Sequence, residues 1–105
     1  MASSPASRSL KVMRERGYRA QVVERFNQFA KVRHDLFGIV DIVCVGNGET
    51  IGVQATSGSN VASRIKKIED SDALADLRDA GWKIVVHGWR KNAKGRWELR
   101  EVDIS

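Results

Sequence analysis

Cysteine, histidine and long apolar runs are scarce in this chain of 105 residues. Cys44 is the only cysteine and lies inside an apolar stretch, so the chain contains neither a disulfide framework nor a zinc site built from cysteines. The two histidines, His34 and His87, are remote from each other in the sequence and lack the spacing of paired metal ligands. We expect His87, in an apolar strand, to be a hydrogen-bonded core residue.

The chain also lacks a hydrophobic segment for secretion or membrane insertion. No stretch approaches the ~20 apolar residues of a membrane span, and the first nine residues, MASSPASRS, contain no apolar signal region. We therefore expect an intracellular, cytoplasmic protein without membrane contact. No repeat and no glycine-rich phosphate loop is present, and nothing indicates a small-molecule cofactor. Ser57 and Ser59 have no evident base and orienting partner, which argues against a serine nucleophile.

Positive charge is what the sequence has in excess. Eighteen lysines and arginines face thirteen aspartates and glutamates, for a net charge of +5. This balance favours a polyanionic partner, of which DNA is the foremost candidate. With 42% hydrophobic and 30% charged residues, the composition predicts one globular domain over residues 9–105, preceded by a flexible tail at residues 1–8.

The longest apolar stretch, residues 36–45, contains a single carboxylate, that of Asp41. Its β-branched composition predicts a largely buried strand. Asn47 and Gly48 supply the two positive-φ positions of a tight hairpin turn. A second strand, residues 50–56, follows the turn and alternates apolar with polar residues.

The hairpin register brings two polar side chains together. If Asn47 and Gly48 form the loop, Asp41 lies opposite Gln54, with Cβ atoms about 5 Å apart. A carboxylate in an apolar strand is costly unless it is paired, neutralised or bound to a cation. Two oxygen-bearing side chains at this distance suit a hard metal such as Mg²⁺. The alternative is structural, with Gln54 hydrogen-bonding a half-buried Asp41.

Periodicity and turn residues predict the remaining elements. They are a helix at 9–16, a strand at 18–26 whose apolar face Glu24 interrupts, a turn at 27–31, a helix from about 61 to 68, a second helix ending at Gly81, and strands at 83–89 and 97–104. This α-β-β-β-α-β-β order predicts an α/β fold with a central mixed sheet flanked by helices. We expect the three tryptophans to serve core and rim packing rather than a base-stacking platform.

Several basic and polar side chains are candidates for contact with nucleic acid. On the helix after residue 60, Arg64 lies on the flank of the sheet-facing side, Lys67 follows one turn later, and Lys66 lies on the opposite flank. The loop at 90–96 is also basic, although a charged hairpin tip is ordinary surface. The candidates are Arg33, His34, Ser57, Arg64, Lys66, Lys67, Lys91 and Lys94.

The element order, with an aspartate on the middle strand and a polar pair on the next, resembles the PD-(D/E)XK nuclease superfamily. Within it, the chain looks most similar to the small archaeal Holliday-junction resolvases and the VRR-NUC type nucleases. The residues that carry the resemblance are Gly38-Ile39-Val40-Asp41, Gln54-Ala55-Thr56, and Arg64 and Lys67 on the following helix. The resemblance in element order covers nearly the whole chain from about Ser9, although the motif that carries it is short. It implies a restriction-endonuclease-like fold.

The resemblance also implies a set of metal ligands and catalytic groups. The ligands to Mg²⁺ or Mn²⁺ would be Asp41, Gln54 and the carbonyl of Ala55, with Glu15 on the first helix completing the site. The chain departs from the family in having Gln54 where glutamate is usual and Thr56 where lysine is usual.

The catalytic candidates are therefore Asp41, Gln54, Thr56 and Glu15, with Arg64 or Lys67 in place of the family lysine. Glu15 also fits an ordinary solvated partner of a neighbouring arginine.

Three functions remain open at this point. The first is a homodimeric, metal-dependent endonuclease that cuts branched or otherwise structured DNA. The second is a DNA-binding module that keeps the nuclease fold but cuts weakly or not at all. The third is a scaffold in which the pair of Asp41 and Gln54 is purely structural; it alone predicts no salt-dependent affinity for DNA. The compact chain suits a protein encoded by a phage or a mobile element.

Overall fold

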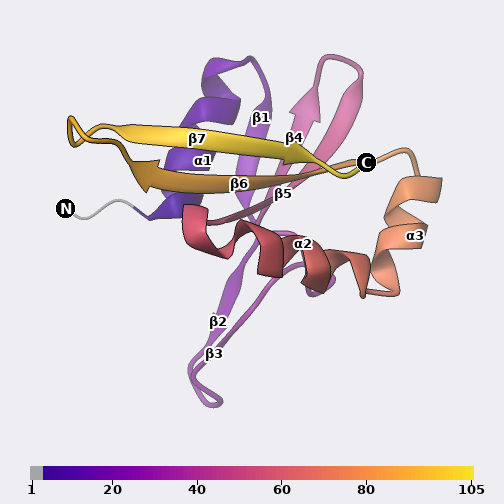
Figure 1. The fold of residues 1–105 in the computed structure, drawn as a ribbon. Coiled ribbons are helices and arrows are strands. Elements are labelled where there is room, and N and C mark those ends of the chain that lie inside the picture. The colour runs from indigo at the N-terminus through magenta and orange to yellow at the C-terminus, as the bar shows by residue number, and fades with distance from the viewer. Residues whose placement is uncertain (1–3) are drawn as a thin grey trace.

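The computed structural model describes residues 4–105, without the side chains of Phe26, Asn27, Val32 and Arg33. Its elements are α1 (Pro5–Glu15), β1 (Arg19–Val22), β2 (Arg25–Asn27), β3 (Val32–His34), β4 (Ile42–Gly46), β5 (Glu49–Ser57), the 3₁₀ turn η1 (Gly58–Asn60), α2 (Val61–Glu69), α3 (Ala73–Asp79), β6 (Lys83–Lys91) and β7 (Trp97–Asp103). Five strands form a mixed sheet in the order β1-β4-β5-β6-β7, and only β5 and β6 pair in parallel. The expected α/β fold with helices flanking a mixed sheet is confirmed (Figure 1).

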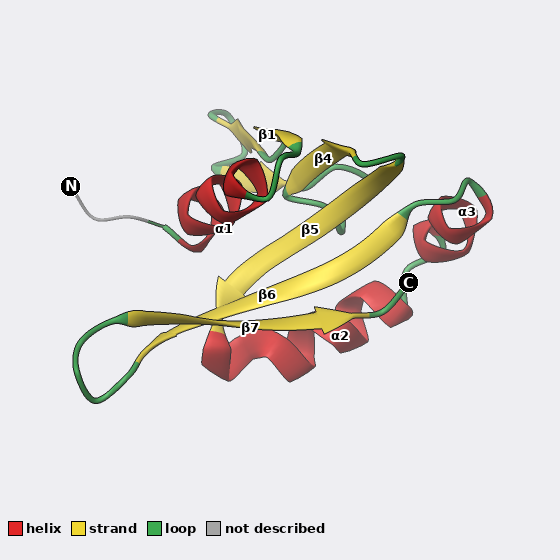
Figure 2. Ribbon diagram, turned by 90° about the horizontal axis from the view of Figure 1, so that it is seen from above, coloured by secondary structure: helices red, strands yellow, loops and turns green. Residues whose placement is uncertain are grey.

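Helices cover both faces of this sheet (Figure 2). On one face, Met13 of α1 packs on buried residues of β1, β4, β5 and β6. On the other, Val61 and Ile68 of α2 join Leu74 and Leu77 of α3 in a second core. Because successive side chains of a strand point to opposite faces, β6 contributes to both cores. Among the described residues, no helix is long and apolar enough to span a membrane.

The central hairpin has the predicted register. Ile42 pairs with Val53 and Gly46 with Glu49, so the loop consists of Asn47 and Gly48. Both loop residues have positive φ, 53° and 77°, as a turn of this kind requires. The ladder ends at Ile42 and Val53, and Asp41, one residue before it, donates its N–H to the carbonyl of Val53, so the predicted facing of Asp41 and Gln54 lies outside the paired residues.

Helix α1 begins earlier than predicted. Residues 5–8 were expected in a flexible tail, with Ser9 as the cap, but the helix begins at Pro5. Ser4 caps it through a reciprocal pair of hydrogen bonds with Ser7, and proline is favourable at the first helical position because its missing N–H is not needed there. The rest of the expected tail, residues 1–3, lies outside the described residues.

Two predicted strands are each interrupted. The strand expected at 18–26 divides into β1 and β2. Strand β2 pairs only with β3, in a separate two-stranded sheet, and the turn expected at 27–31 connects the two strands. The strand expected at 36–45 begins only at Ile42. Before it, Phe37 and Gly38 adopt positive φ in a tight turn that backbone hydrogen bonds between Leu36 and Val40 close.

A buried polar network anchors α1 to the sheet. Trp89 Nε1 donates a hydrogen bond to Ser9 Oγ, which lies 2.8 Å from His87 Nδ1. Because the Glu101 carboxylate can only accept, His87 Nε2 donates to it, and the neutral imidazole then accepts the Ser9 hydroxyl proton at Nδ1. Burial lowers the pKa of His87, which is fully enclosed. The prediction of a hydrogen-bonded core histidine is confirmed.

Replacing Ser9 with alanine should destabilise the protein. Ser9→Ala leaves Trp89 Nε1 and His87 Nδ1 without their partner in the core, and we expect a loss of about 2 kcal/mol in the free energy of unfolding. Chemical denaturation measures it, with the exposed Ser59→Ala as control, for which a change within about 0.5 kcal/mol is expected. Equal effects of the two substitutions would contradict the anchoring role.

Candidate metal centre

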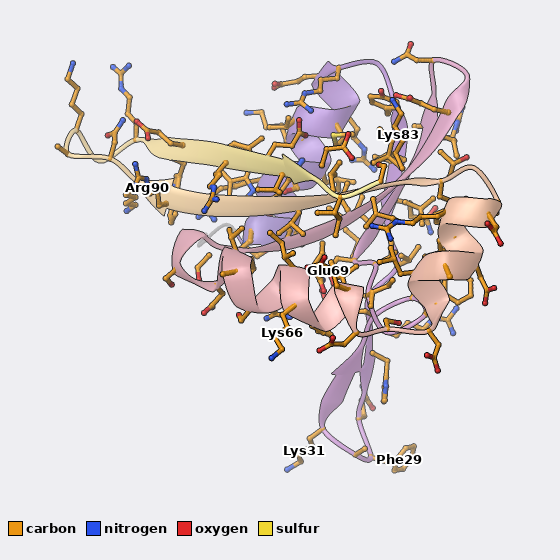
Figure 3. The ribbon with its side chains drawn as sticks, turned by 45° about the vertical axis from the view of Figure 1, so that its right-hand side comes forward. Phe29, Lys31, Lys66, Glu69, Lys83 and Arg90 are labelled. Atoms are coloured by element: carbon orange, nitrogen blue, oxygen red, sulfur yellow. The ribbon has the colours of Figure 1, made fainter. Side chains whose placement is uncertain are left out.

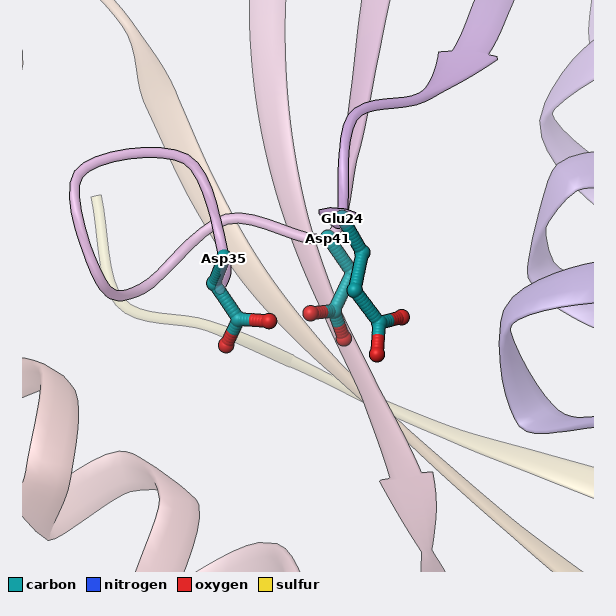
Figure 4. A group of neighbouring side chains, drawn as sticks. All are labelled: Glu24, Asp35 and Asp41. Atoms are coloured by element: carbon teal, nitrogen blue, oxygen red, sulfur yellow. The ribbon is translucent and has the colours of Figure 1, made fainter. Parts of the chain in front are cut away.

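Three carboxylates converge where the chain enters and leaves the β2–β3 hairpin (Figure 4). Glu24 precedes β2, Asp35 follows β3 and Asp41 precedes β4. One oxygen atom from each lies within 4.8 Å of the other two. The three acids thus come from three separate segments of chain that the fold brings to one point.

Backbone hydrogen bonds fix Asp41 at this point. Its N–H donates to the carbonyl of Val53 at 2.9 Å, and its carbonyl accepts from Val23 N–H at 2.8 Å. Its carboxylate Oδ2 accepts from Ala55 N–H at 2.9 Å. The turn that contains Phe37 and Gly38 then folds the chain so that Asp35 lies beside Asp41.

The cluster lies in a cleft of about 570 Å³ between the N-terminal part of α1, the end of β5 and α2. Two cations from α2, Arg64 and Lys67, line this cleft together with the acids. From β5, the cleft is lined by Ala55, Thr56 and Ser57. Five of the predicted site residues are therefore gathered around the acidic cluster: Ala55, Thr56, Ser57, Arg64 and Lys67.

Asp35 is held by two neighbouring side chains. Lys67 Nζ lies 3.2 Å from its Oδ2, and Gln54 Nε2 donates to the same oxygen at 3.3 Å. Burial raises the pKa of Asp35, but hydrogen bonds with Asp41 and Lys67 outweigh that effect and hold it below the usual value. The Asp35 carboxyl is accordingly the charged member of the pair that it forms with Asp41.

Asp41 has the opposite tendency. Burial raises its pKa to about 7, the adjacent Asp35 adds to the rise, and the hydrogen bond from Ala55 N–H opposes it. The residue is only 5% exposed. A carboxyl that is this enclosed and this close to a second carboxylate keeps its proton at pH values below about 7 unless a cation is present.

Gln54 adds an observation that points to a ligand. Its side chain is 1% exposed, and its Oε1 has no hydrogen-bond partner among the described residues. A buried acceptor without a partner costs about 1–3 kcal/mol. Carboxylate and amide oxygens are the ligands that Mg²⁺ and Mn²⁺ prefer. The cluster of acids and the amide oxygen of Gln54 thus fit a hard divalent cation.

Other predicted residues lie away from this cleft. Leu10 of α1 lines it, but Glu15 is five residues later, about 140° around the helix, and lines a separate hollow with Trp89 and Trp97. Glu15 does not belong to the acidic cluster. Lys66 projects from the outer side of α2 (Figure 3).

The remaining candidates are spread over the surface. Lys91 and Lys94 are at the exposed end of the β6–β7 hairpin. His34, at the end of β3, lines a neighbouring hollow with Asp35. The backbone of Arg33 is in β3, and its side chain lies outside the described part of the chain.

Sequence reasoning missed two acids of the cluster, Glu24 and Asp35. A signal for Glu24 was present, because it interrupts the apolar face of its strand. For Asp35, the following Gly38 indicated a turn, but the surrounding apolar residues favoured a continuous strand. Both acids are at strand ends, and nothing in the periodicity showed that the fold would bring them to Asp41.

Comparison with known proteins adds no relative. No protein-family model matches the chain, and neither a curated protein nor a solved structure shows significant similarity to it.

The raised pKa of Asp41 predicts a pH dependence of stability. The folded state holds this proton more tightly than the unfolded chain, whose ordinary pKa is 3.8, so the contribution of Asp41 to stability falls as the pH rises from about 4 to about 7. Asp41→Asn is spared that loss. Between pH 5 and pH 8, its free energy of unfolding should rise by about 2 kcal/mol relative to the parent.

Chemical denaturation of both proteins in EDTA, at four pH values, measures this difference. Taking the difference removes the contribution of His87, whose lowered pKa makes both proteins more stable as the pH rises through 6.5. A difference that does not change with pH would contradict the assignment.

Proposed function

We propose that this protein is a metal-dependent DNA endonuclease that hydrolyses phosphodiester bonds in branched or otherwise structured DNA. The observation that carries the proposal is the meeting of Glu24, Asp35 and Asp41 within 4.8 Å, beside the unpartnered oxygen of Gln54. A purely structural role gives little reason for three carboxylates to lie this close, because each one raises the cost of charging the others.

The order of elements supports a restriction-endonuclease-like fold. Without the β2–β3 hairpin, the chain runs through a helix, an antiparallel three-stranded meander, a helix and a strand parallel to the last strand of the meander. Asp41 immediately precedes the middle strand of that meander, and Gln54, Ala55 and Thr56 are on the next one. The PD-(D/E)XK pattern that the sequence resembles has its acidic and polar positions on the same elements.

The residues of the cleft have separable roles in this proposal. Asp41, Asp35, Glu24 and Gln54 would hold Mg²⁺ or Mn²⁺, with Glu24 and Asp35 replacing Glu15 as the additional acids. When bound, the metal would lower the pKa of an attacking water and offset charge on the scissile phosphate. Ala55 fixes the Asp41 carboxylate through its N–H. Its carbonyl would be a further ligand to the metal, as the resemblance implies.

The cations of α2 would receive the DNA phosphate. Lys67 is the stronger candidate to replace the family lysine, because its ammonium already contacts the acidic cluster through Asp35. Arg64 lines the same cleft and would bind an adjacent phosphate. The hydroxyl of Thr56 would orient a water without supplying charge.

A second candidate function is DNA binding without cleavage. The presence of Thr56 where the family has lysine favours it, since a site that lacks a cation at that position loses stabilisation of developing charge. The net charge of +5 supports DNA binding equally in both cases. Only the enzyme predicts metal-dependent cutting. We propose a homodimer for the enzyme, since two strands must be cut.

The experiment that tests the proposal is cleavage of labelled four-way-junction, flap and linear duplex DNA in Mg²⁺, Mn²⁺ or EDTA. We expect metal-dependent cutting that Asp41→Asn abolishes, while folding and salt-sensitive DNA binding persist. Glu15→Gln is the matched control, because it removes an acid from outside the cluster and should cut like the parent. Equal activity of Asp41→Asn and the parent would contradict the proposal.

Two adjacent lysines separate catalysis from general charge. Lys67→Ala removes the cation bonded to Asp35 and should lower the cleavage rate about 100-fold at saturating DNA. Lys66→Ala removes the same charge from the outer side of α2 and should weaken DNA binding slightly while leaving that rate unchanged. Single-turnover kinetics measures both. Equal rate losses would show that Lys67 acts only through net charge.

A further inference from the structure

The β2–β3 hairpin, residues 25–34, projects from the body of the protein as an arm (Figure 1). Its strands pair with each other, Arg25 with His34, and not with the five-stranded sheet. Phe29 and Lys31 are at its far end, away from both helices of the second core (Figure 3). The proposed chemistry uses the two ends of this arm but does not require its length or its projecting shape.

The chemistry of the arm is that of a nucleic-acid contact. Phe29 is 100% exposed, which is rare for a large aromatic side chain unless it meets a partner. Arg25, Lys31 and His34 are exposed, and the sequence of residues 25–34 contains no acid. This charge favours a polyanion over a second copy of the same arm, which it would repel.

The arm is directly continuous with the metal centre. Glu24 immediately precedes it and Asp35 immediately follows it, so both ends of the arm are held at the acidic cluster. Phe29 is five residues beyond Glu24. At about 3.3 Å per residue of extended chain, the tip reaches about 16 Å from the cluster.

We propose that the arm is a DNA wedge, in which Phe29 inserts between bases, Lys31 contacts a flanking phosphate, and Arg25 contacts the DNA backbone at the base of the arm, nearer the metal centre. Apolar side chains that enter base steps unstack them, and the cost is least where bases are already unpaired. The wedge therefore selects branched DNA. With about 3.4 Å per nucleotide along a strand, its reach sets the cut about five nucleotides from the branch. This inference rests on the proposed function for its DNA partner.

The test uses four-way-junction DNA with 2-aminopurine at the branch, in EDTA, so that unstacking is measured without cleavage. The parent and Phe29→Leu should raise the fluorescence several-fold, because both carry an apolar wedge. Phe29→Ala should abolish the rise and lower the preference for junction over linear duplex about tenfold. Val45→Ala, which trims an exposed apolar residue of β4, should behave like the parent.

Several results would overturn the wedge. One is a Phe29→Ala variant whose fluorescence rise and junction preference equal those of the parent. Another is conversion of a dimer to a monomer by that substitution, because the arm would then contact a second copy of the chain. A failure of the proposed nuclease looks different: base unstacking in EDTA without cutting in Mg²⁺ supports the wedge and removes the enzyme. Cutting of all DNA shapes alike, with no unstacking, removes the wedge alone.

Discussion

The buried carboxyl of Asp41 is the constraint on which the rest of the structure depends. The side chain is 5% exposed and lies against Asp35, so burial and a neighbouring carboxyl both disfavour its charged form. The Ala55 N–H offsets part of that cost, and Lys67 stabilises the charge of Asp35. The oxygen of Gln54 still has no partner among the described residues. An apolar residue at position 41 would remove this cost, which is the physical reason for assigning the cluster a function rather than a role in stability.

The backbone creates this arrangement by joining three chain segments at one point. The hairpin register sets the start of β4 beside β5, where Asp41 donates its N–H to the Val53 carbonyl and accepts from Ala55 N–H through its carboxylate. The β2–β3 arm begins after Glu24 and ends before Asp35, so any group that binds both acids also holds the base of the arm. Metal binding in the cleft and the position of the arm are consequently coupled, because Glu24 and Asp35 are adjacent in the chain to the two ends of the arm.

Most of the sheet and half of the site could be predicted from the sequence, because local turn chemistry fixed the register. The pair Asn47-Gly48 predicts the hairpin loop, and the pairing of Ile42 with Val53 follows from it. The two other acids could not be predicted this way, because they meet only through the arm and the turn before β4. The early start of α1 had a local signal, Pro5 after a serine cap, which the small polar residues around it obscured.

The central claim is that the acids of the cluster bind a divalent cation. Anomalous diffraction from crystals of the protein grown with Mn²⁺ tests it most directly, because the method locates the ion without relying on activity. If the cluster binds the ion, we expect one strong peak within bonding distance of Asp41 and of at least one of Glu24 and Asp35. A peak elsewhere, or none at Mn²⁺ concentrations that support cleavage, would contradict it.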